Sequence, residues 1–110
     1  MYKRQELPLR VDFFDRPKQM VDFERGKSAL TKYKVIAIEN GKTRIHFYPI
    51  TGRTHQLRIH ASHHLGLNTS ILGDDLYGKT LDRLYLHAEK ISFIHPVNNK
   101  KMEFIAKCPF

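Results

Sequence analysis

The chain has 110 residues, of which 41% are hydrophobic and 27% charged, the composition of one small globular domain or of part of a larger one. These figures exclude a disordered chain, a fibrous chain and two independent cores. Lysine and arginine total 19 against 11 aspartate and glutamate, and the formal net charge of +8 favours a polyanionic partner without identifying one. No apolar run approaches the roughly 20 residues that a membrane-spanning helix needs, and no signal peptide opens the chain, so a soluble, cytoplasmic protein is predicted.

The first thirty residues mix charged and apolar types without a sustained period, which predicts loops with short strands. Their one strand-like stretch is residues 9–14. From Thr31 onward, β-branched and aromatic residues occupy both alternating sets of positions, which predicts a strand buried on both faces. Asn40 and Gly41 then supply the two positive φ angles of a type I′ turn, so this strand and the next are expected to form a hairpin.

Thr54 is placed to cap a helix that ends at Gly66. The apolar stripe of this helix, at i, i+4 and i+8, consists of Leu57, Ala61 and Leu65. Residues 65–80 form a loop too long for a simple connector, and long ordered loops tend to carry function. Alternation over residues 84–93 and a turn at 96–100 predict a second hairpin. The expected fold class is α+β, a mixed or antiparallel sheet with one main helix.

The densest group of polar side chains lies in the segment TGRTHQLRIH. Its members are Arg53, His55, Gln56, Arg58 and His60. Arg58 directly follows Leu57, so it sits about 100° around the helix from the apolar stripe, at the border between core and solvent. A guanidinium there can hold a carboxylate or a phosphate through two parallel hydrogen bonds. The plainer alternative is a surface arginine that makes a modest salt bridge.

Histidines at two neighbouring turns of the same helix raise the question of a metal. His60 and His64 form an H-x-x-x-H pair, which makes a zinc-dependent hydrolase one candidate. The pair lacks the glutamate of H-E-x-x-H, and its third ligand is unplaced. The candidates for that ligand are His46, His87 and His95. Helix histidines are usually ordinary polar residues, so no metal is predicted.

Two adjacent carboxylates, Asp74 and Asp75, lie in the long loop. Two acids that work on one bond face each other, whereas neighbours in sequence are expected to point in different directions. Asp74 is expected to close its own loop through an Asx-type hydrogen bond. By chemistry alone, no complete catalytic set is assembled from the residues of this chain.

Three blocks of sequence resemble the RNA pseudouridine synthases of the RluA type, within the wider RluA/RsuA group. The first block is PITGRTHQLRIH, similar to the family's P-x-T-G-R-[TS]-H-Q-L-R-[VI]-H. The second is LGLNTSILGDDLYG, similar to G-x-x-x-x-[IL]-x-G-D-x-x-Y-G, although Ser70 stands where the family commonly has proline. The third is RLYLHAEKISFIHP, similar to R-x-x-L-H-A-x-x-L-x-F-x-H-P. With GKSALTKYKV, the resemblance covers the chain from about residue 7 to its end.

This resemblance implies a parent enzyme that isomerises uridine to pseudouridine in structured RNA, detaching the base from the ribose, turning it and rejoining it through carbon. No cofactor and no metal are implied. The family's essential aspartate belongs to an H-R-L-D-x-x-T-S-G segment, and its base-stacking tyrosine to a K-x-Y-x-A segment; this chain contains neither. Residues 1–110 are therefore expected to be the C-terminal part of a single catalytic domain and to be inactive alone.

By the same resemblance, Arg58 is the arginine that pairs with the family's aspartate. A carboxylate beside a fixed guanidinium stays ionised and oriented, as a nucleophile or base at C1′ of the ribose requires. The implied substrate-binding residues, which line the cleft or brace its loop, are Leu57, Arg53, His55 and Gln56. The target base is expected to be flipped out of its stack.

The expected partner is ribosomal or transfer RNA, and no membrane is expected. A domain cut across its sheet exposes a strand edge and apolar residues, so self-association of this chain is also expected. The alternative function is a non-catalytic module that binds structured RNA. It predicts salt-sensitive RNA binding that survives Arg58→Ala, because phosphate contacts would dominate the affinity.

Overall fold

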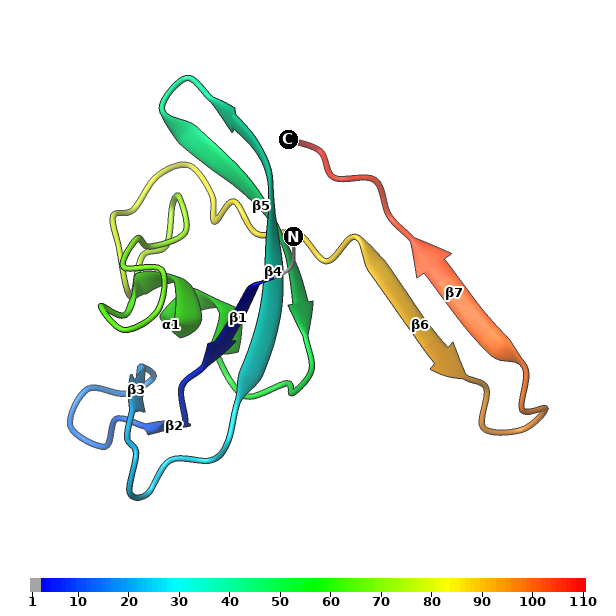
Figure 1. Cartoon of the computed structure of the whole chain (residues 1–110), viewed down its shortest axis with the longest axis horizontal. Helices are drawn as coiled ribbons and strands as arrows, with labels where there is room; N and C mark the ends of the chain where they lie inside the picture. Colours follow the sequence, from blue (N-terminus) through cyan, green and yellow to red (C-terminus); the bar gives the residue numbers. More distant parts are fainter. Residues whose placement is uncertain (1–2) are drawn as a thin grey trace.

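Antiparallel strands make up most of the regular structure of the computed structural model, which describes residues 3–110 (Figure 1). In chain order, the elements are β1 (Lys3–Glu6), β2 (Leu9–Val11), β3 (Gln19–Val21), β4 (Leu30–Glu39), β5 (Lys42–Pro49), α1 (Gln56–Ser62), β6 (Lys90–Ile94) and β7 (Lys101–Ile105). One helix with antiparallel sheets confirms the α+β class. Over the described residues, no helix combines the length and the apolar character needed to cross a bilayer.

The main sheet has three strands in the order β1-β4-β5, with every neighbour antiparallel. The predicted hairpin between β4 and β5 is confirmed, because Asn40 and Gly41 have φ angles of 51° and 72°, the positive values that its tight turn requires. A bulge between Val35 and Ala37 shifts the register of the hairpin halfway along β4. Helix α1 lies against one side of this sheet (Figure 1).

The prediction that β4 is buried on both faces is wrong. Thr31 and Tyr33, near its start, are 0% and 9% exposed, whereas Val35, Ile36 and Ile38 are 45%, 43% and 74% exposed. The short helix reaches only the first part of the strand, and the β4–β5 hairpin extends beyond it (Figure 1). Apolar residues on a strand show what could be buried, while burial itself needs a covering element.

Helix α1 is shorter than its apolar spacing predicts. It begins after His55, which is left-handed with φ 52° and provides no side-chain cap, so the predicted cap at Thr54 is wrong. It ends at Ser62, and Leu65, expected on the apolar stripe, lies beyond the helix and is 54% exposed. The buried face of the helix consists of Gln56, Ile59, His60 and Ala61. Two of these four side chains are polar, which a search for apolar spacing cannot detect.

Around this face, the core is small. Leu9, Ala29 and Ile59 form it, with Val21 and Tyr77 packed against them.

The expected strand over residues 9–14 is only three residues long. It ends at Val11 because Asp12 begins a turn, in which its backbone N–H donates to the Lys18 carbonyl at 2.9 Å. The strand pairs with β3, which the sequence pattern did not reveal. Arg10 on β2 donates from Nε to Oδ2 of Asp22 at 2.6 Å and so ties the two strands together.

The second predicted hairpin, β6–β7, is confirmed, but its first strand begins at Lys90 rather than at residue 84. This hairpin projects away from the main sheet (Figure 1). The radius of gyration of the Cα atoms is 15.3 Å, against about 13 Å for a compact domain of this length. Large apolar side chains on the hairpin are therefore exposed; they are Ile91, Phe93, Ile94, Phe104 and Ile105.

Candidate functional site

The helix that carries the polar cluster is anchored to the sheet by His60, whose side chain is wholly buried. Its Nε2 lies 3.0 Å from the Leu7 carbonyl and its Nδ1 lies 2.9 Å from Oγ1 of Thr31. A carbonyl only accepts, so Nε2 carries the proton and Nδ1 accepts from the threonine hydroxyl. Burial lowers the pKa of His60, and the hydrogen bond to Leu7 opposes this only in part, so the ring is neutral at pH 7.

These bonds contradict the zinc alternative, since both ring nitrogens of His60 are engaged by the scaffold. His63 likewise accepts the Leu65 N–H at Nδ1 and stacks on His64 with ring centroids 4.3 Å apart. Nowhere in residues 3–110 do three or more His, Cys, Asp or Glu side chains gather closely enough to hold a metal ion.

Gln56 begins the helix and is 3% exposed. Its amide nitrogen donates to the Leu30 carbonyl at 3.0 Å and to Oγ1 of Thr31 at 2.8 Å. Its amide oxygen accepts from the backbone N–H of Arg53 at 3.0 Å and from the hydroxyl of Thr51 at 2.7 Å. Two of these bonds run to the start of β4 and two to the turn before the helix, so this side chain holds the two segments together.

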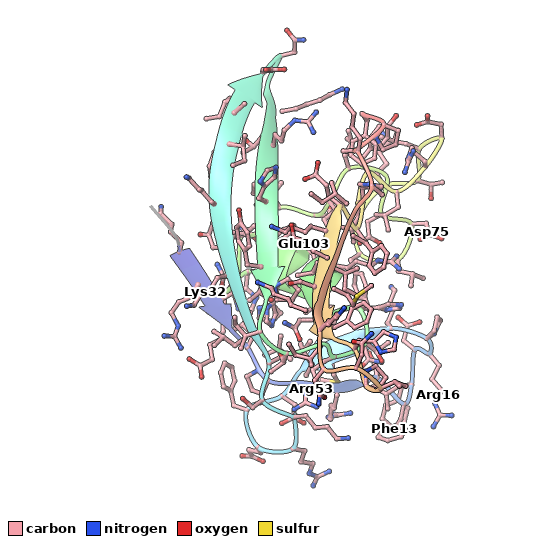
Figure 2. The ribbon with its side chains drawn as sticks, turned by 90° about the vertical axis from the view of Figure 1, so that its right-hand side faces the viewer. Phe13, Arg16, Lys32, Arg53, Asp75 and Glu103 are labelled. Carbon is pink, nitrogen blue, oxygen red and sulfur yellow. The ribbon has the colours of Figure 1, made fainter. Side chains whose placement is uncertain are left out.

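The other two candidates beside it are less buried. Arg53 is exposed and donates from Nε to the carbonyl of Ser28 at 2.9 Å, which ties the same turn to the segment before β4. Leu57 is half-buried on α1. In Figure 2, Arg53 lies in the lower part of the molecule and Asp75 higher up on the long loop. The structure thus separates Arg53 from the group around Arg58.

Arg58 meets two carboxylates of the long loop. Its Nε and Nη2 donate to Oδ2 and Oδ1 of Asp74 at 3.0 and 2.6 Å, and Nη2 also donates to Oδ1 of Asp75 at 3.1 Å. The side chain of Arg58 is 15% exposed, that of Asp74 0% and that of Asp75 66%. The plainer prediction of a surface arginine is therefore wrong, and so is the expectation that the two aspartates point apart.

Asp74 also performs the loop closure that was predicted for it. Its Oδ1 accepts from the backbone N–H groups of Leu76 and Tyr77 at 3.1 and 3.2 Å. Burial raises the pKa of Asp74, but the hydrogen bonds from Arg58 and from these two amides outweigh it and leave the pKa below its usual value. Gly73, before it, has φ 81°, and a Cβ there would collide with the carbonyl of Arg83. The loop is thus built to present a buried, ionised carboxylate to the helix.

Tyr77 closes the group and was not among the predicted site residues. Its hydroxyl accepts from the backbone N–H of Gln19 at 2.8 Å and lies 2.8 Å from Nδ1 of His55, while the guanidinium carbon of Arg58 lies 5.4 Å from the ring centroid. Burial and then the charge of Arg58 lower the pKa of His55, and burial raises that of Tyr77. Both groups are uncharged at pH 7. The signal available in the sequence was the tyrosine of the G-D-x-x-Y-G pattern, which is Tyr77.

Taken together, α1 and the loop hold one guanidinium in a fixed place. Arg58 uses Nε and Nη2 for Asp74 and Asp75, so the edge of the guanidinium that carries Nη1 is the one that can meet a further carboxylate or phosphate. The neutral His55 and Tyr77 lie on the same side of the helix as this charge. Such an arrangement can orient an anionic group without supplying a proton donor of low pKa.

A family model described as RNA pseudouridylate synthase matches residues 3–63. The chain is 43% identical over 115 residues to the dual-specificity RNA pseudouridine synthase RluA of Haemophilus influenzae, covering 99% of this chain and 51% of that protein. It is 47% identical over 110 residues to the protein of the same name from Pasteurella multocida, covering 94% of this chain and 49% of the relative. The chain thus spans about half the length of the curated relatives it matches.

A solved structure, human RNA pseudouridylate synthase domain containing 4, matches with a TM-score of 0.71 and 22% identity over 98% of this chain and 52% of that one. At this identity the likeness concerns the fold. It agrees with the α+β arrangement of one helix and antiparallel sheets.

Proposed function

The chain belongs to the RNA pseudouridylate synthase family, and from this premise we propose that the protein of which it forms a part isomerises uridine to pseudouridine in RNA. In that reaction the bond from N1 of uracil to C1′ of the ribose breaks and a bond from C5 to C1′ forms. C5 loses a proton and N1 gains one, so atoms and electrons balance without a redox partner. We propose that no cofactor or metal takes part.

The observation that carries this proposal is the fixed guanidinium of Arg58, held by the wholly buried Asp74. We propose that its remaining edge pairs with the aspartate of the H-R-L-D segment, which lies outside this chain, and keeps that carboxylate ionised for attack at C1′. Residues 1–110 would then be the C-terminal part of a single catalytic domain, inactive without that aspartate.

The other site residues divide between contact and support. Leu57 and His55 are proposed to line the uracil site, and the contacts of His55 with Tyr77 beside Arg58 support this placement. Arg53 and Gln56 are proposed to brace the site, since their hydrogen bonds run to the backbone and side chains of the scaffold. Access by base flipping fits such a recessed group.

The test of this function is conversion of RNA by the full-length protein. After incubation with an unmodified RNA, the RNA is digested to nucleosides and pseudouridine is separated from uridine by chromatography. We expect pseudouridine with the full-length protein and none with the 110-residue chain. Absence of pseudouridine from every structured RNA tried with the full-length protein would contradict the function. Conversion by the 110-residue chain would contradict the need for the aspartate of the H-R-L-D segment.

The proposed partner is a structured ribosomal or transfer RNA, in line with relatives that carry the name dual-specificity RNA pseudouridine synthase. The proposed location is the cytoplasm. A non-catalytic RNA-binding module remains the second candidate, favoured by the formal net charge of +8. The two candidates differ in the expected effect of Arg58→Ala. In a non-catalytic module this substitution would leave RNA binding, its only activity, unchanged.

Self-association of the 110-residue chain is proposed as well. Val35, Ile36 and Ile38 on β4 and the apolar side chains of β6 and β7 are exposed, and within residues 3–110 strand β5 pairs only with β4. We expect the apparent mass in light scattering to rise with concentration. Ile38→Lys, at a side chain that is 74% exposed, should shift this rise to higher concentration, and a constant monomer mass in both proteins would contradict the proposal.

A further inference from the structure

One face of the main sheet turns away from the site around Arg58. Thr31 and Tyr33 are buried on the side of α1, and side chains alternate along a strand, so Lys32 and Lys34 point to the opposite side. In Figure 2, Lys32 lies on one side of β4 and β5, and Asp75, which contacts Arg58, lies on the other. Whatever meets these lysines does so away from the candidate active site.

The register of the sheet assembles further cations there. Arg4 on β1 stands opposite Lys32, and Lys32 stands opposite Tyr48 on β5, while Lys34 stands opposite His46. Residues directly opposite each other in antiparallel strands project to the same face. Together with Arg44, two positions from His46, they define the cationic face: Arg4, Lys32, Lys34, Arg44, His46 and Tyr48.

Among the described residues, two cations of the cationic face stand directly opposite each other. Like charges directly opposite each other on neighbouring strands destabilise a sheet, and Arg4 and Lys32 are such a pair. The acidic residue beside them is Glu6, which accepts from Arg4 at 3.1 Å with both side chains 60% exposed, a pair weakened by solvent. An anion laid across the three strands would relieve this repulsion.

A hollow and an aromatic ring complete the surface. The hollow has a volume of about 490 Å³ and is lined by Lys3, Arg4, Lys32 and Tyr48. Tyr48 is 39% exposed, and its ring meets His46 edge to face with the centroids 6.5 Å apart. Cations that track a backbone beside a ring on which a base can stack are the two parts of a single-strand binding surface. An acidic protein segment would use the cations but would not need the ring.

We propose that the cationic face is a second RNA-binding surface. It binds a single-stranded segment of the RNA that is distant from the target uridine. This inference rests on the proposed function, which makes RNA the partner. Lys32 and Lys34 pair with phosphates and Tyr48 stacks on a base. The RNA strand reaches this surface by passing around an edge of the β-sheet, so one RNA molecule contacts both faces of the sheet.

The first experiment measures the salt dependence of RNA binding by the full-length protein, using fluorescence polarisation of a labelled oligouridine over a series of NaCl concentrations. Each phosphate contact to a single strand contributes about 0.7 to the slope of log affinity against log salt. The double variant Lys32→Gln with Lys34→Gln should therefore reduce the magnitude of this slope by about 1.4, which means a weaker salt dependence. The matched control is Lys100→Gln with Lys101→Gln, at the turn into β7, which removes the same charge and should leave the slope nearly unchanged.

The second experiment separates RNA from other polyanions. Tyr48→Ala should weaken binding of the oligouridine by about five- to a hundredfold and leave binding of heparin, which has no bases, unchanged. Tyr48→Phe keeps the ring and should bind the RNA like the unaltered chain.

Equal slopes for the two lysine variants would overturn the inference, and so would an equal loss of RNA and heparin binding in Tyr48→Ala, which would indicate a general polyanion surface. The proposed enzymatic function is tested by a separate measurement, the formation of pseudouridine by the full-length protein. If the full-length protein forms pseudouridine but the Lys32 and Lys34 double variant keeps the unaltered slope, only the second surface is contradicted. If the double variant has a slope of smaller magnitude but the full-length protein forms no pseudouridine, only the enzymatic function is contradicted.

Discussion

Arg58→Ala in the full-length protein is expected to lower the rate of pseudouridine formation by about a hundred- to a thousandfold, the usual effect of removing one fixed donor from a reacting anion. Arg58→Lys should lose nearly as much, because an ammonium cannot bond Asp74 through two parallel donors and still offer a planar edge to a second carboxylate. The rate is measured in single turnover with enzyme in excess, so that RNA affinity does not mask the chemical step.

The control for this prediction is Arg25→Ala, which removes an exposed arginine on the turn after β3. It subtracts the same charge from the protein and should leave the single-turnover rate within about twofold. An Arg58→Ala protein that converts RNA at the unaltered rate would show that the guanidinium is structural, and the proposed pairing with the family's aspartate would then be abandoned.

Asp74→Ala is expected to destabilise the 110-residue chain by about 3–5 kcal/mol, because it leaves the guanidinium of Arg58 largely buried without its main partner and frees two loop amides. Asp75→Ala removes a carboxylate that also contacts Arg58 but is 66% exposed, and it should cost less than about 1 kcal/mol. Urea unfolding followed by circular dichroism gives both values. Equal losses in the two variants would contradict a special role for the buried carboxylate.

The pH dependence of stability should carry the same signature. The pKa of Asp74 is lower in the folded chain than in the unfolded one, so the folded state binds fewer protons and gains stability as the pH rises. This contribution is fully present above the unfolded pKa, about 3.9, and is lost as the pH falls through the folded pKa. The Asp74→Asn chain should lack this part of the acid limb, whereas a limb as steep as that of the unaltered chain would assign it to other carboxylates.

Another such carboxylate is Asp22. The hydrogen bond from Arg10, followed by the amides of Arg25 and Glu24, lowers its pKa from 3.8 to about 2. Its contribution is likewise lost as the pH falls below the unfolded pKa, so Asp22 should keep part of the acid dependence in the Asp74→Asn chain.

The features that the sequence predicted well are those decided by neighbours in the chain. The turn at Asn40 and Gly41 is confirmed because only a few residue types adopt its positive φ angles, and both hairpins follow from alternation over short spans. The start of α1 was mispredicted because the left-handed His55, rather than the good capping residue Thr54, precedes the helix. Here bonds of Gln56 to β4 override the local preference.

The candidate site was predicted only in part, because some of its contacts join residues that are far apart in the chain. Arg58 stood out by its position at the edge of an apolar stripe, but its partner Asp74 is 16 residues away, across a loop without helix or strand, and no spacing rule connects them. Tyr77 joins the group through a backbone N–H of β3, 58 residues distant along the chain. Contacts of this kind exist only once the chain has folded.

The anchoring of α1 by His60 bears on how the chain folds. A seven-residue helix without a side-chain cap is unstable in isolation, where even helices of about 12–15 residues are marginal. The bonds of His60 close loops of 29 and 53 residues, so most of the entropy of loop closure is spent before the helix gains its support. Helix α1 should thus form late and together with the β1-β4 pairing, and its backbone amides should exchange with solvent through the same cooperative opening as those of β4.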